Sequence, residues 1–187
     1  MSNYTRRAFT ALSLSSVISL SACSTPDVLR VDPSVIDARV DYSLNQLYQD
    51  YPNTRALAQK ASGILIMPLV TEAGFGVGGS YGRGALRIND KTVDYYSSVS
   101  ATVGFQIGAQ QYAHVLFFMT DDALAGFRNS QGWAAGGDIE YSIPDRGETL
   151  RAETTTAKAP IFAVIFGQSG LKIGATLEGT KYTRIIP

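Results

Sequence analysis

Hydrophobic residues recur at every third or fourth position near the start of the chain, which is the spacing of one face of a helix. This pattern occupies Pro33 to Tyr51 and consists of Ile36, Val40, Leu44, Leu47, Tyr48 and Tyr51. Pro33 suits the first turn of a helix, where its missing amide hydrogen leaves no partner unpaired. Pro52 ends the segment, and Asn53 is placed to cap a second short helix through about Lys60.

After Ala61 the period changes from helical to two, which is typical of strands. Gly63 to Val70 is a short apolar strand in which Pro68 marks an edge or a bulge. The alternation then continues to Ile88. One side of this strand carries Phe75, Val77, Tyr81 and Ala85, and the other carries Gly76, Gly78, Gly82 and Gly84. A turn at Asn89-Asp90-Lys91 follows.

The second half of the chain has the same alternating character. It predicts a half-buried strand over 99–109, a central strand over 112–119, further extended structure over 132–143, a strand over 161–166 and renewed alternation over 171–177. Thr120 is placed to cap a helix whose first turn carries Asp121 and Asp122. The polar stretch 145–158 is expected to be a long surface loop or hairpin. The fold class is α+β: a mainly antiparallel, strongly curved or barrel-like sheet with the N-terminal helix and short helices packed on it.

The first 22 residues have the features of an export signal rather than of a folded element. Arg6 and Arg7 precede an apolar run that is too short to span a bilayer, which needs roughly 20 apolar residues. Thr5-Arg6-Arg7-Ala8-Phe9 resembles the twin-arginine motif, which would export the domain already folded. Paired arginines also occur in general secretion signals, which is the alternative interpretation.

The sequence Leu20-Ser21-Ala22-Cys23 resembles the lipobox of bacterial lipoproteins. In that case the signal is cut before Cys23, whose sulfur is acylated (palmitate being one such acyl group), and Cys23 becomes the first residue. The alternative is an ordinary secretory signal followed by an unpaired thiol. We therefore expect a signal peptide at 1–22, a lipidated tether at 23–32 and one domain at 33–187. Ser24, rather than aspartate, is compatible with an anchor in the outer membrane, facing the periplasm of a bacterial cell envelope.

Charge and histidine content exclude several function classes. Removing the two arginines of the signal leaves 14 basic against 16 acidic residues, which gives no support to nucleic-acid binding. His114 is the only histidine, so multi-histidine metal sites are excluded. It lies in an apolar run that predicts a buried, hydrogen-bonded side chain, and a catalytic base in a Ser-His-Asp triad is the less favoured alternative. Asp121 and Asp122 are explained by the helix dipole. Asp138 and Glu140 share a strand face by spacing, which allows a carboxylate pair, but the sequence offers no partner base for it. We expect no catalytic residues, no metal and no cofactor.

The stretch Gly74-Phe75-Gly76-Val77-Gly78-Gly79 fits the G-x-G-x-x-G pattern of dinucleotide-binding turns. That motif requires a helix to begin at the glycines, whereas a strand pattern runs through them, so we reject a nucleotide site. Glycines on one face of a strand leave room for something to come close. The helix from Pro33 is the simplest occupant, and a lipid chain in the groove is the alternative.

Four stretches of the chain resemble the SYLF domain family, also described as the yeast actin-patch domain family. They are KASGILIMPLVTEAGFGVGGSYGRGAL at 60–86, VGFQIGAQQYAHVLFFM at 103–119, DDALAGF at 121–127 and FGQSGLKIGATLEGTKYTRI at 166–185. The resemblance implies a lipid-binding module, which in eukaryotic relatives has phosphoinositides and actin filaments as partners. Actin binding is not expected of an exported bacterial protein. The membrane-facing helix of eukaryotic members is basic, whereas the matching helix here carries Asp37, Asp41 and Asp50 against Arg39.

The function expected from the sequence is therefore that of a non-catalytic envelope lipoprotein that binds lipid or a membrane surface. The candidate contacts for a phospholipid ligand and its headgroup are Arg83, Arg87, Lys91, Gly76 and Gly78, with a weaker basic patch at Lys172, Lys181 and Arg184. The alternative is an interaction module for an unknown envelope protein. Its candidate anchors are Tyr95, Tyr96 and Trp133, although core or strand packing is the favoured explanation of these aromatic residues.

Overall fold

The computed structural model describes residues 32–136, 139–142, 159–170, 177 and 179–187 of the chain, all within one compact unit, Val31–Pro187. Its elements are α1 (Pro33–Asp50), α2 (Thr54–Lys60), β1 (Gly63–Ile88), β2 (Lys91–Phe118), α3 (Asp121–Asn129), β3 (Trp133–Ala134), β4 (Ile139–Ser142), β5 (Ile161–Gly170) and β6 (Lys181–Ile185). The expected loop at 145–158 and the alternation at 171–176 lie outside the described residues. No helix among the described residues is long and apolar enough to cross a bilayer.

Two long antiparallel strands form the centre of the fold. The 26 residues of β1 pair with the 28 residues of β2, from Gly63 opposite Phe118 to Ile88 opposite Lys91. The strand segments expected separately on each side of the turn are thus joined into two continuous strands. Asn89 and Asp90 connect them with φ values of 50° and 61°, and positive φ at both central residues is what a tight type I′ hairpin turn requires.

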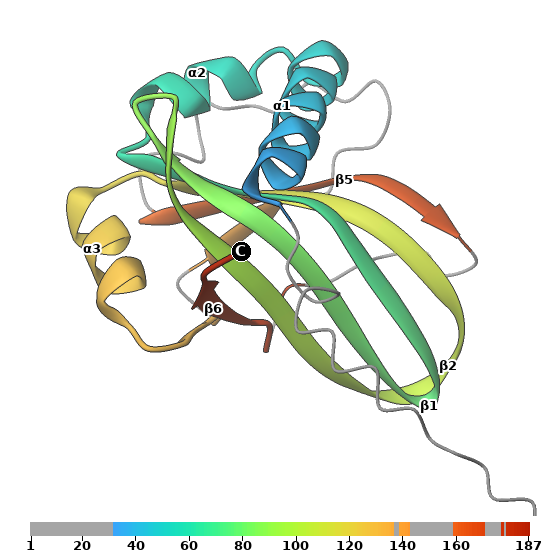
Figure 1. Cartoon of the computed structure of the whole chain (residues 1–187). Coiled ribbons are helices and arrows are strands. Elements are labelled where there is room, and N and C mark those ends of the chain that lie inside the picture. Colours follow the sequence, from blue (N-terminus) through green and yellow to red (C-terminus); the bar gives the residue numbers. More distant parts are fainter. Residues whose placement is uncertain (1–31, 137–138, 143–158, 171–176, 178) are drawn as a thin grey trace, which may run out of the picture. The chain divides into compact units, whose positions relative to one another are not determined.

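Both long strands double back midway, which curls the sheet (Figure 1). The pairing register of β1 shifts between Phe75 and Val77 at this bend. The first half of β2 pairs with β6, and its second half pairs with β5, so the strand order is β3-β6-β2-β5-β4 with β1 also on β2. The expected α+β fold with a curled, mainly antiparallel sheet is confirmed, although β4 runs parallel to β5. β6 was not expected from the sequence.

The glycines of β1 accommodate the other half of the same strand. A Cβ atom added to Gly82 would lie 2.7 Å from Cγ2 of Val70, and one added to Gly84 would overlap the carbonyl oxygen of Ile66. At the bend, a Cβ on Gly74 would lie 2.6 Å from Cα of Gly78. The expectation that α1 occupies the glycine face is therefore wrong. The doubling back of β1 removes the room that a helix or a lipid chain would need against Gly82 and Gly84.

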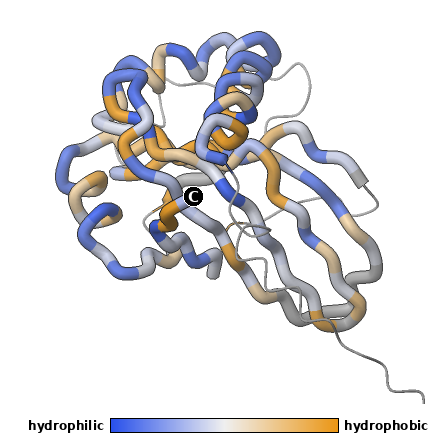
Figure 2. Tube along the Cα trace, viewed as in Figure 1, coloured by the Kyte–Doolittle hydropathy of each residue, from blue (hydrophilic) through white to orange (hydrophobic). Residues whose placement is uncertain are grey.

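Alternate residues of the sheet face two separate hydrophobic cores. Ile64 and Ile66 of β1 pack with α1 and α2 on one face, while Leu65 and Met67 pack with α3 on the other. The apolar stripe expected on α1 is confirmed, because Ile36, Val40, Leu44 and Leu47 are all buried. Figure 2 shows the hydrophobic positions gathering where α1 meets the sheet. α1 is thereby held against the outer face of the curled sheet.

Side chains cap two of the three helices found among the described residues. Asp32 accepts a hydrogen bond from the amide of Ser34 at 2.9 Å, and Thr120 accepts one from the amide of Ala123 at 3.2 Å, as expected for Thr120. The cap expected at Asn53 is wrong, because its side chain makes no capping hydrogen bond. The hydroxyl of Thr54 instead donates to the carbonyl oxygen of Tyr51 at 2.7 Å, which ties α2 to the end of α1.

Candidate functional site

One flank of α1 is bound to the sheet through its carboxylates. Asp37 accepts hydrogen bonds from the hydroxyl of Thr92 at 2.8 Å and from that of Tyr95 at 2.9 Å. Asp41 forms an ion pair with Arg87 at 2.7 Å. Two of the three acidic residues that argue against membrane contact by this helix therefore interact with the sheet. Their negative charge is offset by hydrogen-bond donors and by the guanidinium of the sheet residues.

Burial, followed by the hydrogen bond to Asp37, raises the pKa of Tyr95. The Tyr95 hydroxyl consequently keeps its proton over the whole neutral range and remains a donor to the carboxylate. This fixes the direction of the hydrogen bond and makes Asp37 a permanent attachment point of α1.

We expect Asp37→Ala to lower the free energy of unfolding by about 1–2 kcal/mol, because two donors lose a charged acceptor. Chemical denaturation of the domain at pH 7 measures this. Asp50→Ala is the matched control, since Asp50 is exposed at the end of the same helix and is expected to show no loss. Equal effects of the two substitutions would show that Asp37 does not hold α1.

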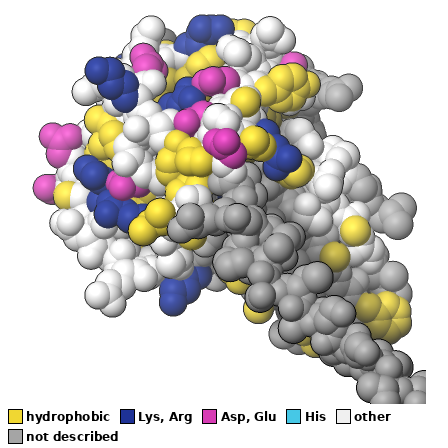
Figure 3. Space-filling model, viewed as in Figure 1, with side chains coloured by type: hydrophobic (Ala, Val, Ile, Leu, Met, Phe, Trp, Pro, Cys, Tyr) yellow, Lys and Arg dark blue, Asp and Glu magenta, His cyan; other side chains and the backbone are white. Residues whose placement is uncertain are grey.

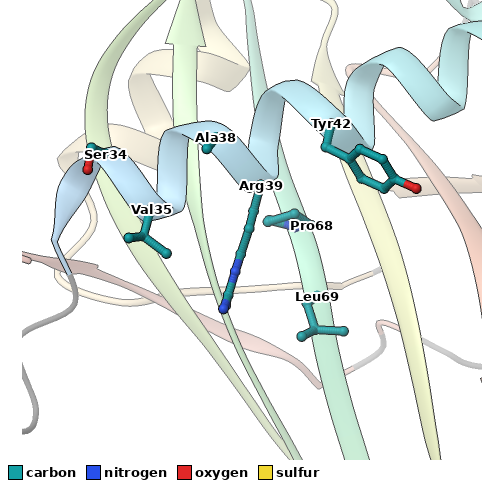
Figure 4. Close-up of a pocket in the computed structure, with 7 residues that line it drawn as sticks. All are labelled: Ser34, Val35, Ala38, Arg39, Tyr42, Pro68 and Leu69. Carbon is teal, nitrogen blue, oxygen red and sulfur yellow. The ribbon is translucent and has the colours of Figure 1, made fainter.

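The opposite flank of α1 and strand β1 enclose an apolar groove of about 610 Å³. Its lining residues are Ser34, Val35, Ala38, Arg39, Tyr42, Pro68 and Leu69. The exposed fractions of Val35, Tyr42 and Leu69 are 41%, 72% and 40%, so these side chains lack cover among the described residues. Figure 4 shows Arg39 extending from the helix between Val35 and Leu69. We call this surface the α1–β1 groove.

The bulge expected at Pro68 explains why the groove exists. The register of β1 against β2 shifts between Met67 and Val70, so Leu69 is partly exposed although its neighbours Met67 and Val70 are buried. The sequence pattern indicated the bulge but not the groove, because the helix that forms the other wall is distant in sequence.

The candidate headgroup residues are spread along the hairpin and do not converge on one point. Arg83 lies over the ring of Tyr81, with 5.6 Å from its guanidinium carbon to the ring centroid, and donates to the Tyr81 hydroxyl. Arg87 is paired with Asp41 near the turn, and Lys91 is exposed just after the turn. Gly76 and Gly78 lie at the far bend. Cys23, Arg6 and Arg7 lie outside the described residues.

The weaker basic patch expected at Lys172, Lys181 and Arg184 is only partly free to bind an anionic headgroup. Arg184 pairs with Asp94 at 2.8 Å, and the same carboxylate oxygen is 3.2 Å from Arg128. Lys181 is exposed, whereas Lys172 lies outside the described residues. Figure 3 shows basic and acidic side chains interspersed over the visible face.

The aromatic residues considered as partner anchors serve mainly in packing. Tyr96 is buried with its ring centroid 4.7 Å from that of Phe127, and Trp133 packs on Phe127 at 5.4 Å. Tyr95 is the donor to Asp37 described above. The packing interpretation is confirmed for Tyr96 and Trp133. Phe75 and Val77 at the bend, by contrast, are apolar side chains that are 79% and 68% exposed.

His114 is fully buried, and its Nε2 is 2.8 Å from the Tyr182 hydroxyl. Burial lowers its pKa to about 3, so the ring is neutral at ordinary pH. The expectation of a buried, hydrogen-bonded histidine is confirmed. The described residues contain no group of three or more side chains able to hold a metal ion.

Other polar groups inside the curl were not anticipated. The amide of Gln110 donates to Glu72 at 2.8 Å, and the hydroxyls of Ser80 and Ser100 are 2.7 Å apart. Burial raises the pKa of the neighbouring Tyr112 to about 12. These residues occupy inward positions of strands that double back, so their polar side chains hydrogen-bond across the interior.

Comparison with known proteins connects these features to a family. Residues 99–184, from the middle of β2 to β6, match the family model described as Ysc84, Las17-binding protein actin regulator. A comparison with curated proteins gives no match. The matched segment includes the stretch at 103–119, the α3 helix and nearly all of the last stretch that carried the resemblance in the sequence. Residues 99–184 therefore match the Ysc84 family, which is also called the SYLF family, as the resemblance in the sequence implied.

Proposed function

We propose that this protein is a non-catalytic lipoprotein of a bacterial cell envelope whose SYLF domain binds membrane lipid at the α1–β1 groove. The observation that carries this proposal is the exposed apolar lining of the groove together with Arg39 at its centre. An apolar surface with an arginine suits the membrane interface, where the aliphatic part of arginine lies along acyl chains and its charge reaches the phosphates.

The internal use of Asp37 and Asp41 supports the same proposal. The helix is net acidic in sequence, yet these two carboxylates accept from or pair with Thr92, Tyr95 and Arg87. The flank that faces away from them presents apolar side chains and Arg39. The acidic composition of α1 is therefore a weaker objection to membrane contact than it is in the sequence alone.

The expected lipid anchor at Cys23 is compatible with membrane contact through the α1–β1 groove. The groove includes the first turns of α1, and the tether at 23–32 leads directly into that helix. Ten extended residues span roughly 35 Å, so acylated Cys23 and the groove can reach the same membrane surface. Export through Arg6 and Arg7 and location at the outer membrane, facing the periplasm, complete the proposal.

Flotation of the domain with liposomes tests the groove. A form that begins at Ser24 lacks the acylation site but keeps the compact unit with both cores. We expect the double substitution Val35→Asp with Leu69→Asp to reduce the bound fraction about tenfold or more, because two apolar contacts become charged. Val93→Asp is the matched control, since Val93 is 41% exposed, like Val35, but lies on β2 outside the groove.

Two results would contradict the proposal. If the unsubstituted domain does not float with anionic or neutral vesicles, it has no intrinsic lipid binding. If the groove variant and Val93→Asp bind equally well, lipid is bound elsewhere. The first result would favour the alternative of a protein-interaction module, for which the exposed Phe75 and Val77 at the bend are the candidate contacts. The Ysc84 family is described as a Las17-binding protein and actin regulator, and we do not expect actin binding of an exported bacterial protein.

A further inference from the structure

A second pocket lies on the flank of α1 that carries Asp41, away from the α1–β1 groove. It has a volume of about 340 Å³ and is formed by the C-terminal half of α1, by α2, by the start of β1 and by the hairpin turn. Its polar side chains belong to Tyr48, Arg55, Gln59, Arg87, Asn89 and Asp90. We call it the arginine pocket. Elements far apart in the sequence thus bring two guanidinium groups and a carboxylate to one small cavity.

Neighbouring residues satisfy only part of the hydrogen-bonding capacity of the Arg87 guanidinium. Its Nη2 is 2.7 Å from Asp41, and its side chain is 15% exposed. Its Nε is buried and has no hydrogen-bond acceptor among the described residues. A buried guanidinium N–H without an acceptor is costly, and the part of the Arg87 side chain that is exposed lines the pocket, where a bound oxyanion can accept from the guanidinium.

Arg55 is oriented by an aromatic ring rather than by a carboxylate. Its guanidinium carbon lies 4.7 Å from the centroid of the Tyr48 ring. Within the part of the chain that the structure describes, none of the ion pairs involves Arg55. Stacking uses the face of the guanidinium and leaves its N–H groups at the edge available for an acceptor.

Asp90 supplies the opposite charge. It lines the pocket from the turn, where its φ of 61° places it in the left-handed region. Burial, followed by the negative charge of Asp90, raises the pKa of Tyr48, whereas the charges of Arg55 and Arg87 lower it. All three charged groups therefore act on the same phenol, which remains a neutral hydrogen-bonding group.

The charges around the arginine pocket balance, because Arg55 and Arg87 are matched by Asp41 and Asp90. A simple anion would be attracted by the arginines but repelled by Asp90. A ligand that carries both charges is complementary to both ends. We propose that the arginine pocket binds a small zwitterion, with an oxyanion held by the guanidinium groups of Arg55 and Arg87 and a primary ammonium group held by Asp90.

This inference is independent of the proposed function, because the pocket and the groove share no residue. The same chemistry has two sources: the headgroup of phosphatidylethanolamine, or a free solute such as phosphoethanolamine. The volume is at the small end of the range for ligand sites, which suits a headgroup-sized ligand.

Nuclear magnetic resonance of the form beginning at Ser24 tests the site directly. Free O-phosphoethanolamine is titrated while the Nε–Hε signals of the arginines are observed, with inorganic phosphate and ethanolamine titrated separately. We expect phosphoethanolamine to shift the Arg87 and Arg55 signals and to bind about tenfold or more tightly than either fragment. Unchanged signals of both arginines at millimolar phosphoethanolamine would overturn the proposal.

Substitutions then assign the two ends of the ligand. Arg55→Gln is expected to weaken phosphoethanolamine binding about tenfold. Arg128→Gln is the matched control without effect, since Arg128 is exposed on α3 and lines neither the pocket nor the groove. Asp90→Asn, in which asparagine tolerates the same backbone conformation, should weaken phosphoethanolamine binding but not phosphate binding. If Asp90→Asn leaves phosphoethanolamine binding unchanged, the pocket does not recognise a zwitterion.

Vesicles distinguish the two sources of the ligand. If the lipid headgroup occupies the pocket, Arg55→Gln reduces flotation with vesicles containing phosphatidylethanolamine and not with vesicles of phosphatidylcholine alone. If a free solute is the ligand, Arg55→Gln has no effect on flotation while the shift of the Arg87 signal by phosphoethanolamine persists. Either result supports the pocket, and neither depends on Val35 or Leu69, whose substitution tests the groove.

Discussion

Replacing Gly84 with alanine is expected to lower the free energy of unfolding by about 3 kcal/mol or more, because the added methyl group overlaps backbone rather than a flexible side chain. A Cβ atom on Gly84 would overlap the carbonyl oxygen of Ile66 and would lie 2.6 Å from the sulfur of Met67. Relief requires the two halves of β1 to separate. That movement would disturb both cores, since Ile66 packs against α1 and Met67 packs on the α3 side.

Gly126→Ala is the matched control for this prediction. Gly126 lies within α3, and no heavy atom is within 4 Å of a Cβ placed there. Alanine is the better helix former, so this variant is expected to gain about 0.5–1 kcal/mol. Urea denaturation followed by circular dichroism measures both variants. A Gly84→Ala domain as stable as the unsubstituted one would show that the halves of β1 are not in close contact.

Lowering the pH from 6.5 to 5 is expected to destabilise the domain by on the order of 1 kcal/mol per pH unit, through His114 alone. Burial lowers the pKa of His114 to about 3 from its ordinary 6.5. Between these values the unfolded chain binds a proton that the folded chain does not, so stability rises with pH. The contribution is fully present above pH 6.5 and is lost as the pH falls toward 3.

Comparison of His114→Gln with the unsubstituted domain isolates this contribution. Ordinary carboxyl groups remain ionised at pH 5, so the slope between pH 5 and 6.5 reports mainly the histidine. We expect the slope of the unfolding free energy against pH to be much smaller in His114→Gln. Tyr182→Phe, which keeps the ring but removes its hydroxyl partner, should retain the slope at lower overall stability. An unchanged slope in His114→Gln would mean that the histidine is protonated in the folded domain.

Periodicity predicted most of the elements of this fold. The helical spacing of Ile36, Val40, Leu44 and Leu47 identified the buried face of α1, and alternation identified the strands. It did not reveal that β1 and β2 each continue through a bend. A strand that curls keeps its alternation on both sides of the bend, so the sequence contains no marker of the change in direction.

The candidate site was predicted less completely for a related reason. The sequence indicates Arg83, Arg87 and Lys91 as headgroup contacts because they are cationic and close to the glycines. The structure assigns Arg87 to Asp41 and places Arg83 over Tyr81. The α1–β1 groove requires Val35 and Leu69 to be adjacent, and the arginine pocket requires Arg55 to meet Arg87. No pattern along the chain indicates such contacts between distant segments.

The sequence by itself determined the kind of each main element, the face of α1 that is buried, the burial of His114 and the family resemblance. These properties follow from local spacing and composition, which act through neighbours along the chain. Only the tertiary structure decided where the acidic side chains of α1 are directed and what lies against the glycines. Whether a carboxylate at the border of an apolar face is solvated or hydrogen-bonded depends on the donors that another element brings to it. For Asp37 these donors are Thr92 and Tyr95, which lie 55 and 58 residues away in the sequence. The glycines likewise indicated that some group packs closely against them, and only the structure shows that this group is the other half of β1.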